Sequence, residues 1–354
     1  MAVAARRVEA APRVEARGVS LRAGLVTAGF LLVALVVGLA FGSVHIGVEA
    51  IVRWTLSDVP GLHVRHASTF DSNILSALRA PRVALAALVG GMLAIAGASY
   101  QGVFRNPLCD PYLLGVAGGA GLGATLAIVY ASTAGTTWAV PLASFAGAIA
   151  AVALTYALGR SVGATHMTGA LVLAGVTMAT FTAAIQTFIQ QRHPQQLQNI
   201  YSWLLGGFST ATWHDVGICA PYIAVSSVVL FLHRRVLDVL SLGDDEAASL
   251  GVNVARARLT IVVAATLGTA AAVSVSGLIA FVGIIVPHLI RLLVSTSYRA
   301  VIPLSLLAGA GFLVLADVLA RTMFSGAEEP IGVITAFLGA PFFAIVLRTS
   351  RSMR

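Results

Sequence analysis

The sequence contains no lysine, few charged residues of any kind and only two cysteines. All 22 basic residues among its 354 are arginine, and charged residues make up 10% of the chain, against about 25% in a typical soluble domain. A Walker A loop requires a lysine to hold the phosphates of a nucleotide, so this chain cannot by itself be a P-loop ATPase. Cys109 and Cys219 are too few for a disulfide framework.

Hydrophobic residues are abundant and make up 58% of the chain. They form runs of about 20 residues, the length that crosses a bilayer as a helix, rather than the short alternating segments of a membrane β-barrel. An all-α integral membrane protein is therefore predicted. The net charge of +8 fits membrane topology better than nucleic-acid binding, because the arginines are scattered between the apolar runs.

Eight apolar runs have the length of one span, and one further region is longer. The eight runs are 24–44, 82–103, 112–131, 138–159, 169–190, 216–233, 301–322 and 331–347. The region 259–294 would form a helix of about 54 Å at 1.5 Å per residue, which is too long for one crossing. We expect a break near Gly277 and therefore ten transmembrane helices.

The arginine distribution predicts that both termini are cytoplasmic. The segments 1–23 and 348–354 are both basic, and basic segments stay on the cytoplasmic side, which requires an even number of spans. We therefore expect a cytoplasmic tail over 1–23, a transmembrane domain over 24–347 and a second tail over 348–354. The run 24–44 is too long for the core of a signal peptide, which has about 7–15 apolar residues, so it is interpreted as the first span.

Small residues recur at every fourth position in two of the predicted spans. They are Gly90, Ala94, Ala98 and Gly102 in one and Gly115, Gly119 and Gly123 in the other. This spacing places them on one helix face and lets neighbouring helices approach closely. It predicts a tightly packed bundle and names no function.

Two polar segments between spans are expected to form short helices. The external segment 191–215 has apolar residues at helical spacing. These are Ile200, Trp203, Leu204 and Phe208. The internal loop 236–256 contains "SLGDDEAASLGV", in which the acids Asp244–Glu246 favour a helix start and Gly251 a stop, so a short helix should project into the cytoplasm.

Four blocks of the sequence resemble the permease subunits of type II ABC importers, the FecCD family. The blocks, in chain order, are 79–123, 242–252, 277–293 and 328–343, including "FRNPLCDPYLLG", "LGDDEAASLGV", "GLIAFVGIIVPHLIRLL" and "EEPIGVITAFLGAPFF". That family imports ferric siderophores, haem and cobalamin. The resemblance covers about residues 75 to 347 and implies a type II permease fold with ten spans.

The resemblance also implies how the protein works and with what. A permease homodimer in the bacterial inner membrane would join two ATP-binding-cassette ATPase subunits, which bind ATP and Mg, and an extracytoplasmic substrate-binding protein. The chain itself would hold no cofactor and catalyse no reaction. Its substrate would be a bulky metal chelate, and nucleic acid is not an expected partner.

Three groups of site residues follow from the resemblance. A cytoplasmic gate is implied at Asn106 and Leu108, opposite Thr168 and Gly169, although the family has small polar residues at the second pair and Gly169 departs from them. ATPase coupling is implied for the segment 241–252. Its residues are Leu242, Gly243, Asp244, Asp245, Glu246, Ala248, Leu250 and Gly251.

The third group is the arginines at outer helix ends. Arg79 and Arg82 are three residues apart and should share a face, and Arg321 ends its span on the same side. The resemblance implies that they receive acids of the binding protein. The alternative is that they anchor helix ends at the interface.

Other functional classes have weaker support. Asp317 is the only acid inside a clear span, and an ion-gradient-driven secondary transporter would need several such groups and inverted repeats; an ion pair with Arg321 at i+4 is the structural interpretation. Among the histidines, His63, His66 and His288 form no metal-binding pattern, so no metal site is predicted. "EEPIGV" places Pro330 at a helix start, and the resemblance implies that this segment lines the outer half of the pathway.

Overall fold

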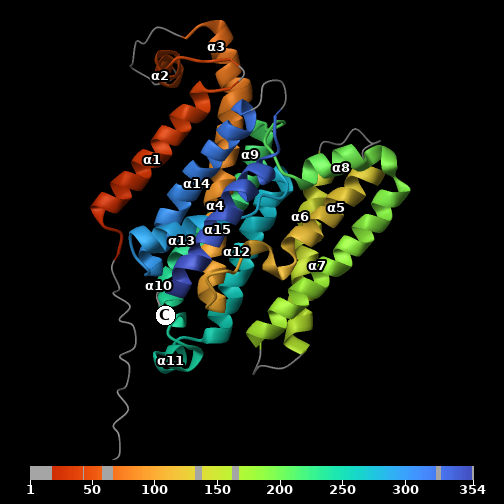
Figure 1. Ribbon diagram of the computed structural model, residues 1–354, viewed down its shortest axis with the longest axis vertical. Helices are drawn as coiled ribbons and strands as arrows, with labels where there is room; N and C mark the ends of the chain where they lie inside the picture. The colour runs from red at the N-terminus through yellow and green to blue at the C-terminus, as the bar shows by residue number, and fades with distance from the viewer. Residues whose placement is uncertain are drawn as a thin grey trace, which may run out of the picture.

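The computed structural model describes residues 18–42, 44–57, 67–131, 138–161, 167–323 and 328–352. Throughout these ranges the regular structure is helical and contains no strand, which confirms the all-α prediction (Figure 1). Most of the predicted tail 1–23 lies outside the described residues. The first helix begins at Leu21 and the last one continues to Ser352, and the boundaries of the two cytoplasmic tails stay predictions.

In the described part of the chain, seven helices are long and apolar enough to cross a membrane, and three apolar stretches are shorter. The long ones are α1 (Leu21–Ala40), α4 (Ala80–Phe104), α6 (Ala139–Ser161), α7 (Met167–Arg192), α9 (Trp213–Leu232), α12 (Val254–Ser276) and α14 (Tyr298–Thr322). The shorter apolar stretches are α5 (Val116–Tyr130), α13 (Val282–Leu293) and the part Ile331–Val346 of α15 (Ile331–Ser352). Each predicted span overlaps one of these helices, so the structure is compatible with ten crossings.

The predicted break near Gly277 separates α12 from α13. Helix α12 ends at Ser276, and Gly277 follows with a φ of +68°. A Cβ at Gly277 would collide with the carbonyl oxygen of Trp203, so glycine is needed here both for its conformation and for the close approach. Phe281 also has a positive φ, +71°, immediately before α13 begins.

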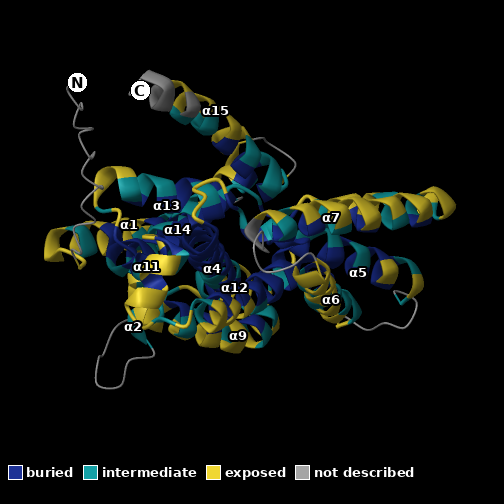
Figure 2. Cartoon of the chain, turned by 90° about the horizontal axis from the view of Figure 1, so that it is seen from below, coloured by how far each residue is buried: buried dark blue, intermediate teal, exposed yellow. Residues whose placement is uncertain are grey.

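Helix α4 forms the centre of the larger of two lobes. It packs against α14, α12, α13 and α9, and in the view of Figure 2 the buried residues gather on α4, α12 and α14. Almost every residue of α4 after Ala80 is buried. A helix that is apolar on all sides belongs in the core of a bundle.

Glycines of the predicted small-residue faces make close helix contacts. Gly90 of α4 lies against Gly309 of α14, and in the other lobe Gly119 of α5 lies against Gly147 of α6. In both pairs the partner's backbone occupies the space that a Cβ would need. Such contacts need glycine because the two backbones approach within the space that a side chain would occupy.

The second lobe consists of α5, α6 and α7, which pack on one another beside the core (Figures 1 and 2). Its outer faces are apolar and exposed, as Leu154 of α6 and Phe181 and Phe188 of α7 show. Large exposed apolar surfaces mark contact with a membrane or with another protein. The chain is therefore a multi-pass membrane protein.

Short elements lie at the two ends of the bundle. At one end are α2 (Val48–Ser57), α3 (Thr69–Ile74) and α8 (Leu197–Leu204); at the other are α10 (Arg234–Leu240) and α11 (Asp244–Ser249) (Figure 1). The expected amphipathic helix is α8, with Ile200 buried. Phe208 lies beyond its end, yet is also buried.

Replacing Gly97 by alanine is expected to destabilise the protein. A Cβ there would collide with the backbone of Gly283 in α13, and overpacking of this kind costs about 1–3 kcal/mol. Gly29→Ala in α1 is the matched control, because no atom lies within 4 Å of its Cβ position and alanine favours a helix interior. Thermal unfolding in detergent should show a lower midpoint for Gly97→Ala alone; equal midpoints would contradict the close approach of α4 and α13.

Candidate functional site

The loop between α4 and α5 is short and stiff. Helix α4 ends at Phe104, and Arg105 caps it with a left-handed φ of +50°. The side-chain oxygen of Asn106 accepts a hydrogen bond of 2.9 Å from the Leu108 amide, which stabilises a turn of the Asx type. A 3-10 turn, η2 (Pro111–Leu114), then leads through Gly115 into α5. The loop thus has a fixed shape.

The η2 turn is capped by an aspartate. The carboxylate of Asp110 accepts a hydrogen bond of 2.8 Å from the Tyr112 amide. Burial raises the pKa of Asp110 to about 6, while this hydrogen bond acts in the opposite direction. The cap therefore depends on the hydrogen bond from the Tyr112 amide. The carboxylate form of Asp110 is less favourable than that of a solvent-exposed aspartate.

Two buried polar side chains fasten the loop to the bundle. Gln101 of α4 donates from Nε2 to the carbonyls of Cys109 (3.3 Å) and Gly283 (3.0 Å), and its Oε1 accepts from Arg291 at 2.5 Å. The Tyr112 hydroxyl donates to the Ile279 carbonyl at 2.9 Å and accepts from the Ile279 amide at 3.0 Å. The loop is therefore joined to the break between α12 and α13. Gln101 and Tyr112 were missed from the sequence.

Three of the four predicted gate residues, Asn106, Leu108 and Gly169, can be described in full. Asn106 and Leu108 are exposed, with Leu108 51% accessible. Gly169 is exposed in the first turn of α7, and nothing lies within 4 Å of where its Cβ would be. Thr168 lies in the same turn, but its side chain is outside the described part. The gate stays a prediction.

Helix α11 is the predicted short helix in the internal loop. It begins at Asp244 after Gly243, and Gly251 ends it with a φ of +83°. Ala247 is fully buried against the bundle, while Leu242 and Leu250 are exposed by 50% and 63%. Helix α11 lies at one end of the bundle (Figure 1), and an exposed leucine flanks it on each side.

Asp244 of α11 connects this helix to two other elements. Its carboxylate accepts hydrogen bonds of 3.1 Å from Arg258 in α12 and lies 3.6 Å from the Arg105 guanidinium. Arg105 directly precedes Asn106. Helix α11 and the α4–α5 loop are thus joined by an ion pair that no sequence signal indicated.

A second acid joins α10 to α14. Asp238 accepts hydrogen bonds from the Ser297 hydroxyl at 2.9 Å and from the Tyr298 amide at 2.6 Å, and Arg299 lies 3.4 Å away. Because the first amides of a helix lack intrahelical partners, Asp238 supplies a cap for α14 from outside that helix.

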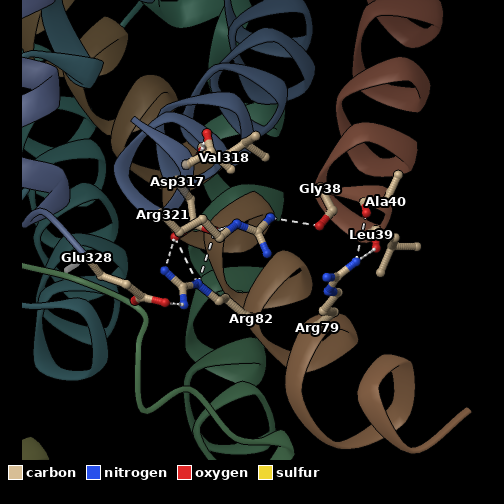
Figure 3. A network of polar contacts seen from close by, with 10 residues as sticks. Gly38, Leu39, Ala40, Arg79, Arg82, Asp317, Val318, Arg321 and Glu328 are labelled. Carbon is tan, nitrogen blue, oxygen red and sulfur yellow. Dashed lines mark hydrogen bonds and ion pairs between the residues drawn. The ribbon is translucent and has the colours of Figure 1, made fainter. Parts of the chain in front are cut away.

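A charged cluster lies at the opposite end of the bundle (Figure 3). Asp317 of α14 is fully buried, and Arg82 of α4 contacts it at 2.9–3.1 Å. Arg321 lies 3.4 Å from the same carboxylate, which confirms the predicted i+4 pair. Arg82 also donates to Glu328 at 3.0 Å. Asp317 therefore has two arginine partners rather than one.

The expectation that Arg79 and Arg82 share an outward face was wrong. Arg79 ends a π-helical turn, η1 (Leu75–Arg79), and its side chain points away from Arg82 towards α1 (Figure 3). It is buried and donates to the carbonyls of Leu39 (2.6 Å), Ala40 (2.8 Å) and Val44. It thus caps the end of α1.

Arg321 is also engaged inside the protein. Its side chain is 5% exposed, and it donates to the carbonyl of Gly38 at 2.7 Å. None of the three predicted docking arginines is a free rim charge, because the side chain of Arg82 is only 11% exposed. Arg79 and Arg321 do not snorkel to an interface either, because the side chains of both are buried and donate to carbonyls of α1; the docking role stays a prediction.

A cavity of about 790 Å³ opens beside this cluster. We call it the outer cavity; its lining includes Arg82, Glu328, Pro330 and the segments 206–212 and 274–277. The segment before α15 is held in this wall, because the amides of Ile331 and Gly332 donate to the carbonyls of Gly206 and Leu205 at 3.1 and 3.0 Å. The placement of Pro330 fits its predicted role in lining the outer half.

The described side chains contain no group of three His, Cys, Asp or Glu residues that could hold a metal ion. Cys109 and Cys219 are buried and unpaired. His288 packs its ring against Phe342, with centroids 5.8 Å apart, and His63 and His66 lie outside the described residues.

Comparisons with known proteins give one consistent result. The sequence model of the FecCD transport family matches residues 30–349. The hemin transport system permease protein HmuU of Yersinia pestis is 37% identical over 330 residues, covering 92% of this chain and 96% of that protein. The cobalamin import system permease protein BtuC of Halobacterium salinarum is 42% identical over 275 residues, 78% of this chain and 73% of that one.

A solved structure agrees with these sequence matches. It is described as an inward-facing conformation of a metal-chelate type ABC transporter, and its chain is 30% identical with a TM-score of 0.78, covering 92% of this chain and 98% of that chain. The fold and the family thus rest on independent comparisons.

Proposed function

Because the chain belongs to the FecCD transport family, we propose that it is the membrane subunit of an ATP-driven importer for a bulky metal chelate. The single observation that carries the proposal is the link from α11 to the α4–α5 loop through Asp244 and Arg105. A projecting helix joined to a stiff loop at the same end of the bundle is suited to transmit a movement from a docked partner to a gate.

In this proposal the end that carries α11 faces the cytoplasm and the outer cavity faces the opposite side. The chain has no lysine for a Walker A loop, so ATP and Mg would be bound by separate ATPase subunits docked on α11. Two copies of the chain would enclose the pathway, as the symmetry of homodimers favours. A substrate-binding protein would deliver the chelate at the outer cavity.

The substrate class is proposed from relatives and from the cavity. Relatives are named for hemin, cobalamin and ferric dicitrate transport. Part of the outer cavity is lined by small and weakly polar residues, among them Gly206, Gly207, Ser274 and Ser276. Such a lining suits a large ligand whose selection is made by the binding protein.

The experiment is uptake by the reconstituted complex. Permease, ATPase and binding protein in liposomes should accumulate ferric siderophore, haem or cobalamin only with ATP, and an ionophore should leave uptake unchanged. Uptake that persists without ATP and stops with the ionophore would instead support an ion-gradient-driven secondary transporter, and the proposal would then be wrong.

Widening the proposed gate should make the complex leak. Asn106→Ala with Leu108→Ala removes the turn-forming amide oxygen and an exposed side chain without touching Gln101 or Tyr112, which hold the loop. Passive efflux of substrate from liposomes without ATP should rise severalfold. Leu154→Ala, a similarly exposed leucine on α6, is the control. Equal efflux in all variants would mean that the loop is only a connector.

The Arg105–Asp244 pair should act as one unit. Arg105 has a left-handed backbone conformation, which costs a non-glycine residue about 1 kcal/mol of folding free energy. Its ion pair with Asp244 is exposed and contributes only about 0.2–1 kcal/mol to stability. We therefore expect an effect on coupling, up to about a fivefold loss of transport per ATP, with little effect on stability.

A double-mutant cycle tests this expectation. Arg105→Gln and Asp244→Asn should each lower transport per ATP, and the double variant should be no worse than Asp244→Asn alone. Arg105→Lys should restore most of the ratio because it restores the charge. Arg256→Gln, an exposed arginine in the first turn of α12, is the control. Fully additive losses would show that the two residues act separately.

A further inference from the structure

A basic cavity of about 360 Å³ lies at the end of the bundle that carries α11. Arg234, Arg235 and Arg299 line it, and Val19, Phe231 and Pro303 complete its walls. These residues come from the start of α1, the junction of α9 and α10, and the beginning of α14. We call it the arginine cavity; it shares no residue with the α4–α5 loop, with α11 or with the outer cavity.

The guanidinium groups of the arginine cavity retain unused donors. Arg235 is exposed and has no ion pair or hydrogen bond with any residue that the structure describes. Arg234 stacks on the Phe231 ring, 3.7 Å from its centroid, and donates one hydrogen bond of 3.0 Å to the Phe231 carbonyl. This leaves its other N–H groups free, while the stacking fixes the orientation of the group.

One acid lies near the cavity and is already engaged. Asp238 is 3.4 Å from Arg299, but its oxygens also accept from Ser297 and Tyr298. Of the three arginines only Arg299 pairs with Asp238, so the charges of Arg234 and Arg235 give the cavity an excess of positive charge. An anion is the ligand that this arrangement favours, and the planar N–H fork of arginine suits a phosphate in particular.

The cavity stands at the end of an apolar stripe. Val225, Val228 and Leu232 of α9 are exposed by 57%, 58% and 69%, and their spacing of three and four residues puts them on one face. The exposed side chains of Leu25 and Val26 lie near the start of α1. In a membrane-spanning chain these surfaces contact acyl chains, so the stripe connects the acyl region with the basic cavity.

We propose that the arginine cavity binds the phosphate headgroup of an anionic phospholipid, with its acyl chains lying along the stripe on α9. A basic pocket between helices at a membrane face is suited to such headgroups. The apolar stripe favours a lipid over a soluble anion as the ligand, because a free phosphate has no acyl chain to contact the stripe. The proposal is independent of the transported substrate.

The test measures bound lipid rather than transport. The full chain is exchanged into vesicles of phosphatidylglycerol and phosphatidylcholine, extracted gently, and analysed by native mass spectrometry. Wild-type protein should retain phosphatidylglycerol in preference to phosphatidylcholine. Arg234→Gln with Arg235→Gln should lower that preference by about 30-fold, and Arg235→Gln alone, at an exposed position without partners, by about fivefold.

Two further arms separate the alternatives. Arg160→Gln with Arg348→Gln removes the same amount of charge from exposed positions predicted on the same membrane face. If this variant lost as much phosphatidylglycerol, the binding would depend only on the overall surface charge, and the proposal would be wrong. Added inorganic phosphate should not displace the lipid. Displacement by inorganic phosphate would identify a soluble-anion site and would likewise overturn it.

Discussion

Asp317→Ala is expected to destabilise the protein by about 3–5 kcal/mol, the range found when one partner of a buried ion pair is removed. Asp317 is fully buried, and its carboxylate is the shared partner of Arg82 and Arg321, whose side chains are 11% and 5% exposed. Without it, two largely buried positive charges would face each other. Thermal unfolding in detergent should show a much lower midpoint and a lower yield of folded protein.

The matched control changes the other acid of the cluster. Glu328 also pairs with Arg82, but its side chain is 46% exposed, and exposed pairs contribute about 0–1 kcal/mol. Glu328→Gln should therefore unfold nearly as the wild type does. A further variant with Asp317→Leu, Arg82→Leu and Arg321→Met should regain much of the lost stability, since apolar replacement of a whole buried cluster can be neutral. An Asp317→Ala protein as stable as wild type would contradict the cluster's structural role.

The same cluster changes how a docking experiment must be designed. Reversing the charge of Arg79 and Arg82 would remove the cap on α1 and the partner of Asp317 together, so loss of partner binding in that variant would report unfolding. Glu328 and Glu329 are the more accessible charges beside the outer cavity. A change at Glu329 can affect docking while the Arg82, Asp317 and Glu328 contacts stay intact.

Local features of the fold could be predicted from the sequence because they depend on neighbouring residues. Span length follows from apolar runs, the break at Gly277 from the excess length of 259–294, and helix α11 from the acids at its start and Gly251 at its end. The four-residue spacing of Gly119 likewise identified a close helix contact.

Contacts between distant segments could not be predicted in this way. Arg82 and Asp317 are 235 positions apart, and nothing in either span indicates the other. The π turn before Ala80 shifts the direction of Arg79 relative to a regular helix, so a face assigned from i+3 spacing was misleading. Gln101 and Arg105 were missed for the same reason: their roles come from partners in α13 and α11.

The candidate gate shows a further limit. Asn106, Leu108 and Gly169 occupy the expected elements, and no atom lies within 4 Å of the position that a Cβ of Gly169 would take. A pathway on a two-fold axis is completed only by a second copy. Neither the sequence of one subunit nor its fold therefore determines the state of the gate.

Helix α11 offers the largest expected functional effect. It is anchored by the buried Ala247 and by Asp244, whereas Ala248, Leu242 and Leu250 are exposed at the tip of the bundle. Exposed apolar side chains on a projecting helix stabilise nothing within the chain, and short apolar anchors surrounded by polar residues are typical of docking surfaces. The acidic first turn would add attraction to a basic partner.

Ala248→Trp is therefore expected to abolish transport while the permease still folds, since the side chain at this position points away from the bundle. A bulky residue in the centre of an interface costs at least about 2 kcal/mol, so the affinity for the ATPase subunit should fall by about 30-fold or more. Binding of purified permease to the ATPase subunit measures this directly. Gly251→Ala tests a second effect, which is the backbone conformation at the end of α11. The φ of Gly251 is +83°, so any side chain there would strain the backbone.

Ala157→Trp, on an exposed position of α6, shows whether an added tryptophan harms insertion or folding in general. It should leave ATPase binding and transport close to wild type. If Ala248→Trp kept full affinity for the ATPase subunit and full transport-coupled ATP hydrolysis, α11 could not be the docking helix. The ion pair between Asp244 and Arg105 would then only brace the α4–α5 loop, and the path from ATP hydrolysis to the gate would have to run through α10 and the Asp238 cap on α14.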